Sequence, residues 1–143
     1  MDEFYELLNE YNKTKIAFSE KAISIVKNSI KNIFEKTQIK AIYWTQYTPY
    51  FNDGEECIFG VQSILVSTDV LSTFDDEESS NTYDTYYLDE KVFSHYEIEL
   101  INNLVRVLRD EDMIEVLKFS FGDSVAITVT KKGISIQGYE HYY

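Results

Sequence analysis

The segment IKAIYWTQY, residues 39–47, marks the point where the spacing of apolar side chains changes from a helical period to a strand period. Within it, residues 39, 41, 43, 45 and 47 alternate with residues 40, 42, 44 and 46. β-Branched and aromatic side chains are frequent, as is typical of strands. Before it, residues 2–36 place apolar side chains three and four positions apart, which predicts an amphipathic helix. The chain therefore combines helix with sheet.

The predicted N-terminal helix is long for a small domain. Acidic Asp2 and Glu3 lie in its first turn and Lys36 lies at its end, an arrangement that suits the helix dipole. Nothing between Asn9 and Lys15 breaks a helix strongly. One continuous helix and two helices that meet near Asn12 both fit the pattern.

A second strand is expected at residues 57–66. The turn signal Asn52-Asp53-Gly54 predicts a hairpin between the two strands, because glycine can adopt the positive φ that such turns need. Residues 67–90 are acidic and show little periodicity, which predicts a long loop or a short irregular strand.

Helix is expected again from Ser94, because Glu97 stands three residues later and completes a capping-box pattern. The other expected elements are a break at 109–112, a short helical segment at 113–119, and strands at 124–130 and 134–137 joined by Lys131-Lys132-Gly133. The sequence thus predicts one α+β domain over residues 1–143, with the order α-β-β-α-β-β and an antiparallel sheet.

Acidic charge is concentrated in one window of the chain. Between Lys40 and Lys91 there are eleven acidic residues and no Lys, Arg or His, and the formal net charge of the chain is -12. A local negative field repels nucleic acid and anionic lipid and attracts basic protein surfaces or cations. We therefore expect no direct binding to nucleic acid or membrane, and a partner protein with a basic surface.

The usual motifs of catalytic and metal sites are missing from the sequence. Neither His95 nor His141 has a partner at metal-ligand spacing, and there is no G-x-S-x-G motif or Gly-rich phosphate loop. The acidic run 75–78 lacks the spaced oxygens and central glycine of a calcium loop. We expect no enzyme activity, no cofactor and no metal.

Cysteine usage points to a reducing compartment. A single cysteine, Cys57, excludes an internal disulfide. Glu55 and Glu56 precede it, and their charge disfavours a reactive thiolate, so we expect a small core residue on the second strand. The N-terminal residues lack the apolar segment of a signal peptide, and no apolar run approaches the roughly 20 residues of a membrane span. We expect a cytoplasmic protein.

Acidic and tyrosine residues are interspersed near the end of the acidic window, and we predict that they bind the partner. Duplex DNA carries one charge per about 1.7 Å of axis, so carboxylates displayed along one face can mimic it. Tyrosine adds contact area with a polar tip. The predicted partner-binding residues are Asp75, Asp76, Glu77, Glu78, Tyr83, Asp84, Tyr86, Tyr87, Asp89 and Glu90.

Two further expectations concern the aromatic residues. The alternative to a partner-binding surface is a pocket that captures a small molecule in the first hairpin. The residues expected to line it are Tyr43, Trp44, Tyr47, Tyr50 and Phe51. Tyrosine-rich strand edges and a long amphipathic helix offer more apolar surface than a small chain buries, so we also expect a homodimer.

The run YWTQYTPYFNDGEECIF, residues 43–59, resembles a motif in small proteins carried by tailed bacteriophages. The run FGDSVAITVTKKGISIQGYEHY, residues 121–142, resembles the same proteins. The resemblance implies a phage or prophage origin and hence the host cytoplasm. The resemblance implies no particular biochemical activity, but it favours a protein that binds and disables a host factor. That factor would be a nucleic-acid-binding or defence protein of the host.

Overall fold

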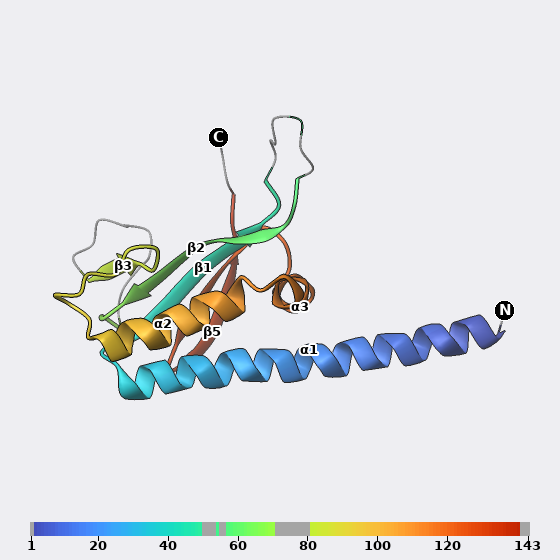
Figure 1. The fold of residues 1–143 in the computed structure, drawn as a ribbon. Helices are drawn as coiled ribbons and strands as arrows, with labels where there is room; N and C mark the ends of the chain where they lie inside the picture. Colours follow the sequence, from blue (N-terminus) through green and yellow to red (C-terminus); the bar gives the residue numbers. More distant parts are fainter. Residues whose placement is uncertain (1, 50–53, 55–56, 71–80, 141–143) are drawn as a thin grey trace.

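The computed structural model describes residues 2–49, 54, 57–70 and 81–140. Figure 1 shows a sheet with helices on one side and a long N-terminal helix that extends past it. The elements in chain order are α1 (Asp2–Lys36), β1 (Ala41–Tyr47), β2 (Gly60–Ser67), β3 (Thr82–Asp84), α2 (His95–Leu108), α3 (Glu111–Phe121), β4 (Val125–Thr130) and β5 (Gly133–Gly138). The predicted α+β class is confirmed.

The sheet has five strands in the order β3-β2-β1-β4-β5, and every neighbouring pair is antiparallel. β1 therefore lies at the centre, although it is the first strand in the chain. β4 and β5 form the predicted C-terminal hairpin, with Gly133 at a φ of 137° directly after the turn. Among the described residues of the acidic segment 67–90 is the short edge strand β3, which pairs with β2.

The two faces of β1 differ because successive side chains of a strand point to opposite sides. Ile42, Trp44 and Gln46 are fully buried, and the two apolar side chains belong to the main core. Ala41 packs with Leu65 of β2 and with Tyr43 in a separate small cluster. The helices thus cover one face of the sheet.

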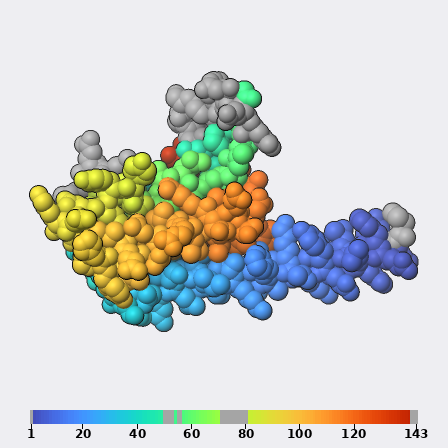
Figure 2. Space-filling view, in the orientation of Figure 1, coloured from blue at the N-terminus to red at the C-terminus, as the bar shows by residue number. Residues whose placement is uncertain are grey.

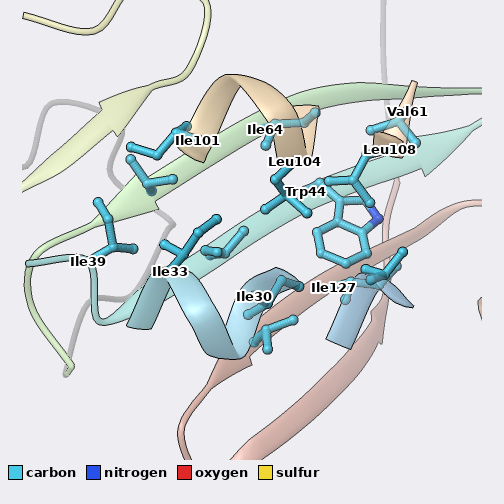
Figure 3. Packing of buried hydrophobic residues seen from close by; sticks show 14 of the residues in the cluster. Ile30, Ile33, Ile39, Trp44, Val61, Ile64, Ile101, Leu104, Leu108 and Ile127 are labelled. Atoms are coloured by element: carbon cyan, nitrogen blue, oxygen red, sulfur yellow. The ribbon is translucent and has the colours of Figure 1, made fainter. Parts of the chain in front are cut away.

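The main core lies between that face and the helices (Figure 3). Trp44 and Ile127 come from the sheet and meet side chains from α1 and α2. The labelled core residues are Ile30, Ile33, Ile39, Trp44, Val61, Ile64, Ile101, Leu104, Leu108 and Ile127. Burial of this apolar surface is the main force that holds the helices on the sheet.

α1 is one continuous helix of 35 residues with no break near Asn12. Its buried side chains begin at Ser19, and every residue from 2 to 18 is exposed. We call residues 2–18 the arm. The arm projects away from the rest of the molecule in Figure 2.

The helix ends follow the sequence closely. Ser94 Oγ accepts a hydrogen bond from Glu97 N at 3.1 Å, and Glu97 Oε1 accepts one from Ser94 N at 3.0 Å, which confirms the capping box. Glu97 Oε2 also accepts from Gln38 N at 3.1 Å, so the start of α2 is tied to the end of α1. Asp110 caps α3 directly after α2 ends, as the predicted break requires.

Two details differ from the sequence prediction. β2 begins at Gly60, and Cys57 is half-buried before the strand, so the prediction of a core cysteine on this strand is wrong. Composition does not show where this strand begins, because residues 57–59 are as typical of a strand as the residues that follow. Gly54 has the predicted positive φ, at 91°, while Asn52 and Asp53 lie outside the described residues.

Candidate partner-binding site

Two adjacent tyrosines are the most exposed large hydrophobic side chains that the structure describes. Tyr86 is 89% exposed and Tyr87 is 80% exposed. They lie directly after β3, in a segment of residues 84–91 that we call the tyrosine loop. Aromatic side chains with this much water-exposed surface have contact area to offer to another molecule.

The tyrosine loop is held by the buried residue Thr85. Its backbone N and its Oγ1 both donate to Ile64 O of β2, at 3.0 Å and 2.8 Å. Tyr87 N then donates to Asp84 O at 3.1 Å, which closes a turn. Because Thr85 is fixed to the sheet, the two residues that follow it are displayed in a defined place.

Asp84 and Asp89 support this conformation with their carboxylates. Asp84 Oδ1 accepts from Tyr86 N at 2.9 Å, and Asp89 Oδ1 accepts from Lys91 N at 2.8 Å. Both side chains remain exposed, as does Glu90. The loop therefore carries three carboxylates beside two exposed aromatic rings, which is the combination that the sequence predicted for a binding surface.

Tyr83 has a different environment from the other predicted tyrosines. It is half-buried, and its ring packs edge-on against Phe93 at a centroid distance of 5.0 Å. Much of its surface is thus used inside the protein. Asp75, Asp76, Glu77 and Glu78 lie outside the described residues.

The structure gives three of the residues predicted to line a pocket in the first hairpin separate surroundings. Trp44 is fully buried in the main core, where its Nε1 donates to Gln46 Oε1 at 3.0 Å. Tyr43 lies on the opposite face of β1, because neighbouring strand residues alternate between faces. Tyr47 stacks on Tyr139 at a centroid distance of 5.5 Å. Tyr50 and Phe51 lie outside the described residues.

A hollow that the sequence did not predict lies between α1 and the β4–β5 hairpin. Its volume is about 640 Å³, within the range of small-molecule sites. Apolar side chains and a backbone turn form its floor, and charged side chains form its rim. The lining residues are Lys27, Ile30, Lys31, Phe34, Glu35, Val129, Thr130, Lys131, Gly133 and Ile134.

The residues that sequence reasoning missed come from separate elements. Lys27 and Lys31 stand four positions apart on α1, which places them on one side of the helix. Lys131 belongs to a turn about a hundred residues later, so only the packed structure brings it to the same rim. Thr85 gave a weak signal, as a small residue between Asp84 and two tyrosines.

Within the ranges that the structure covers, no group of three or more His, Cys, Asp or Glu side chains could hold a metal ion. None of the helices described is long and apolar enough to cross a membrane. Comparison with known proteins finds no matching family model, no matching curated protein and no matching solved structure. The resemblance to phage proteins therefore stays a prediction.

Proposed function

We propose that this chain is a non-enzymatic binding protein of phage or prophage origin that inhibits a host protein with a basic surface. The host protein is one that binds nucleic acid or acts in defence. The observation that carries the proposal is the exposure of Tyr86 and Tyr87, at 89% and 80%, on a loop fixed to the sheet. Because the acidic window surrounds these tyrosines, the partner that fits is cationic.

The carboxylates and the tyrosines have different roles in this proposal. Carboxylates near the rim attract the partner and raise the association rate, and this effect weakens as salt screens the charges. Aromatic side chains that become buried in a complex act as hot spots and slow dissociation. The acidic run 75–78 adds to the field in the same region of the sequence, which is where DNA mimicry is proposed.

The test is a pull-down from bacterial host lysate, followed by kinetics with the captured protein. We expect Tyr86→Ala and Tyr87→Ala to raise the dissociation rate at least tenfold together. The matched control is Tyr96→Ala, because Tyr96 is a 51% exposed tyrosine on α2 outside the loop. If Tyr96→Ala raises the dissociation rate as much as the loop variants do, or if the loop variants leave that rate unchanged, the assignment of this site is refuted.

The charge contribution is tested by changing carboxylates to amides. Glu90→Gln together with amides at 75–78 should slow association and flatten its dependence on salt, with little effect on dissociation. The control for net charge removes the same number of charges from exposed helix positions, by changing Glu20, Glu35, Glu99, Glu111 and Glu115 to glutamine. If both sets of variants slow association equally, the field is diffuse and the acidic window has no special role.

The lysine-rimmed hollow favours a second candidate function, capture of an amphipathic anion. Ile30, Phe34 and Val129 provide a buried apolar floor, while Lys27, Lys31 and Lys131 provide cations at its edge. Titration calorimetry with laurate tests it. We expect Lys27→Gln with Lys131→Gln to weaken binding several-fold, and Lys13→Gln with Lys21→Gln to leave it unchanged. Absence of laurate binding to the unaltered protein would remove this candidate.

A further inference from the structure

Six large apolar side chains form an exposed stripe along α1. Leu7 and Leu8 are adjacent, Phe4 and Leu8 are four residues apart, and the other steps are of three or seven residues, which places all six within one face of the helix. Their exposed fractions lie between 40% and 65%. We call them the arm stripe, and its members are Phe4, Leu7, Leu8, Tyr11, Phe18 and Ile25.

The arm stripe crosses the point where α1 joins the body of the protein. Phe4 to Phe18 belong to the arm, whereas Ile25 lies between the buried residues Ala22 and Val26. The stripe thus extends over about 30 Å, at 1.5 Å per residue. A helical segment of the arm's length is marginal in water on its own, and packing of its apolar face is what stabilises such helices. The arm therefore needs a covering element.

The charges of α1 indicate which element covers the arm. The acids Asp2, Glu3, Glu6 and Glu10 occupy its start, and residues 2–12 contain no basic residue. Basic residues follow from Lys13 onward, and residues 13–36 hold six lysines against two acids. A second α1 in antiparallel orientation brings each acidic start against a basic segment. A parallel pair would instead place like charges together, which is unfavourable.

The root of the arm has a shape that accepts such a helix. A hollow of about 250 Å³ lies where α1 meets α2 and α3. Its lining residues are Phe18, Ala22, Arg106, Val107, Asp110, Asp112, Met113 and Val116. Most of its lining is apolar. Lys15 lines a neighbouring hollow that shares Phe18, Asp112 and Val116 with it, and its Nζ lies 5.1 Å from the centre of the Phe119 ring.

One antiparallel register matches the large side chains of the stripe to this hollow. It places Phe4 of the second copy opposite Ala22, so the large ring enters the space beside the small side chain. In the same register Leu8 lies opposite Phe18. Symmetry then repeats each contact, since an isologous pair buries the same patch on both copies.

We propose that two copies of the chain form a dimer through antiparallel pairing of their arms, with Phe4 of each copy seated in the hollow beside Ala22 of the other. The pairing covers the arm stripe and matches the two charge segments of α1. It leaves the tyrosine loop free on each copy, so a dimer presents two partner-binding sites. The dimer does not depend on the proposed function of that loop.

Light scattering on purified protein at tens of micromolar tests the assembly. We expect twice the 16.8 kDa mass of the single chain. Phe4→Glu with Leu8→Glu should return the mass to that of the monomer, because both charges enter the apolar seam. Asn9→Glu is the matched control, since Asn9 is exposed on the side of the arm away from the stripe, and this variant should stay dimeric. A monomeric unaltered protein, or a dimer indifferent to Phe4→Glu and Leu8→Glu, overturns the proposal.

Oxidative cross-linking tests the orientation. Cys57→Ala removes the natural thiol, and Leu8→Cys and Phe18→Cys are then made in separate chains. Antiparallel pairing predicts a disulfide-linked dimer when the two variants are mixed, and little from either variant alone. Parallel pairing predicts that each variant cross-links with itself, and that result overturns the antiparallel arrangement.

Discussion

Replacement of Gln46 by leucine should destabilise the protein strongly, because this side chain joins β1 to the end of α3. Gln46 is fully buried, and its Nε2 donates to Leu117 O at 3.0 Å and to Gly122 O at 2.8 Å. Its Oε1 accepts from Trp44 Nε1 at 3.0 Å. Leucine fills a similar volume but makes none of these bonds, so the Trp44 indole N–H and the Gly122 carbonyl lose their partner.

An unsatisfied buried polar group costs about 1–3 kcal/mol. The Trp44 N–H takes the larger share, because Gly122 is half-buried and water reaches it more easily. Leu117 O lies within the last turn of α3 and keeps its place in the helix. We therefore expect Gln46→Leu to lower the free energy of unfolding by about 2–4 kcal/mol. For a chain of this size that is a fall in Tm of roughly 5–15 °C.

The assay is urea unfolding followed by tryptophan fluorescence, since Trp44 is the only tryptophan and is itself buried. Gln62→Leu is the matched control. Gln62 is half-buried and its Nε2 makes one long hydrogen bond, 3.5 Å, to Tyr47 O. The Gln62→Leu substitution should lower the free energy of unfolding by less than about 1 kcal/mol. If Gln46→Leu is no more destabilising than Gln62→Leu, the buried hydrogen bonds do not stabilise the fold as argued.

Three further predictions concern turns and caps. Gly133→Ala should lower the free energy of unfolding by about 1–2 kcal/mol because its φ of 137° is strained for an L-residue, whereas Gly138→Ala, in open space, should have little effect in the same urea assay. Ser94→Ala should cost about 1 kcal/mol by removing the cap of α2, while Ser120→Ala at the exposed end of α3 should be close to neutral. Partial burial raises the pKa of Asp123, but hydrogen bonds from Thr48 and Ser124 together outweigh it and hold the pKa below its ordinary value. The stabilisation that the Asp123 carboxylate contributes is therefore complete above its unfolded-state pKa and is lost as pH falls through its folded-state pKa. Asp123→Asn should flatten the acid limb of a profile of unfolding free energy against pH. An unchanged acid limb would contradict this.

Local patterns in the sequence were sufficient for most of the secondary structure. The helical spacing of residues 2–36 predicts helix over the observed bounds of α1, but it left open a break near Asn12, and the structure shows one continuous helix. Ser94 and Glu97 predict the start of α2, since a capping box needs only residues three apart. The alternation in β1 also places Trp44 and Tyr43 on opposite sides, although the predicted pocket had combined them.

Which face of each element is covered was decided by contacts between residues far apart in the chain. The strand pattern of β1 is symmetric, so only the packing of α1 and α2 onto one side buries Trp44 and removes it from any pocket. The lysine-rimmed hollow needs α1 beside the β4–β5 turn, and the display of Tyr86 needs Thr85 fixed to Ile64. The amphipathic arm shows the same division. The spacing of residues determines its apolar stripe. Whether the rest of the chain covers that stripe depends on how far the sheet extends along α1, and the sheet ends before it reaches the arm.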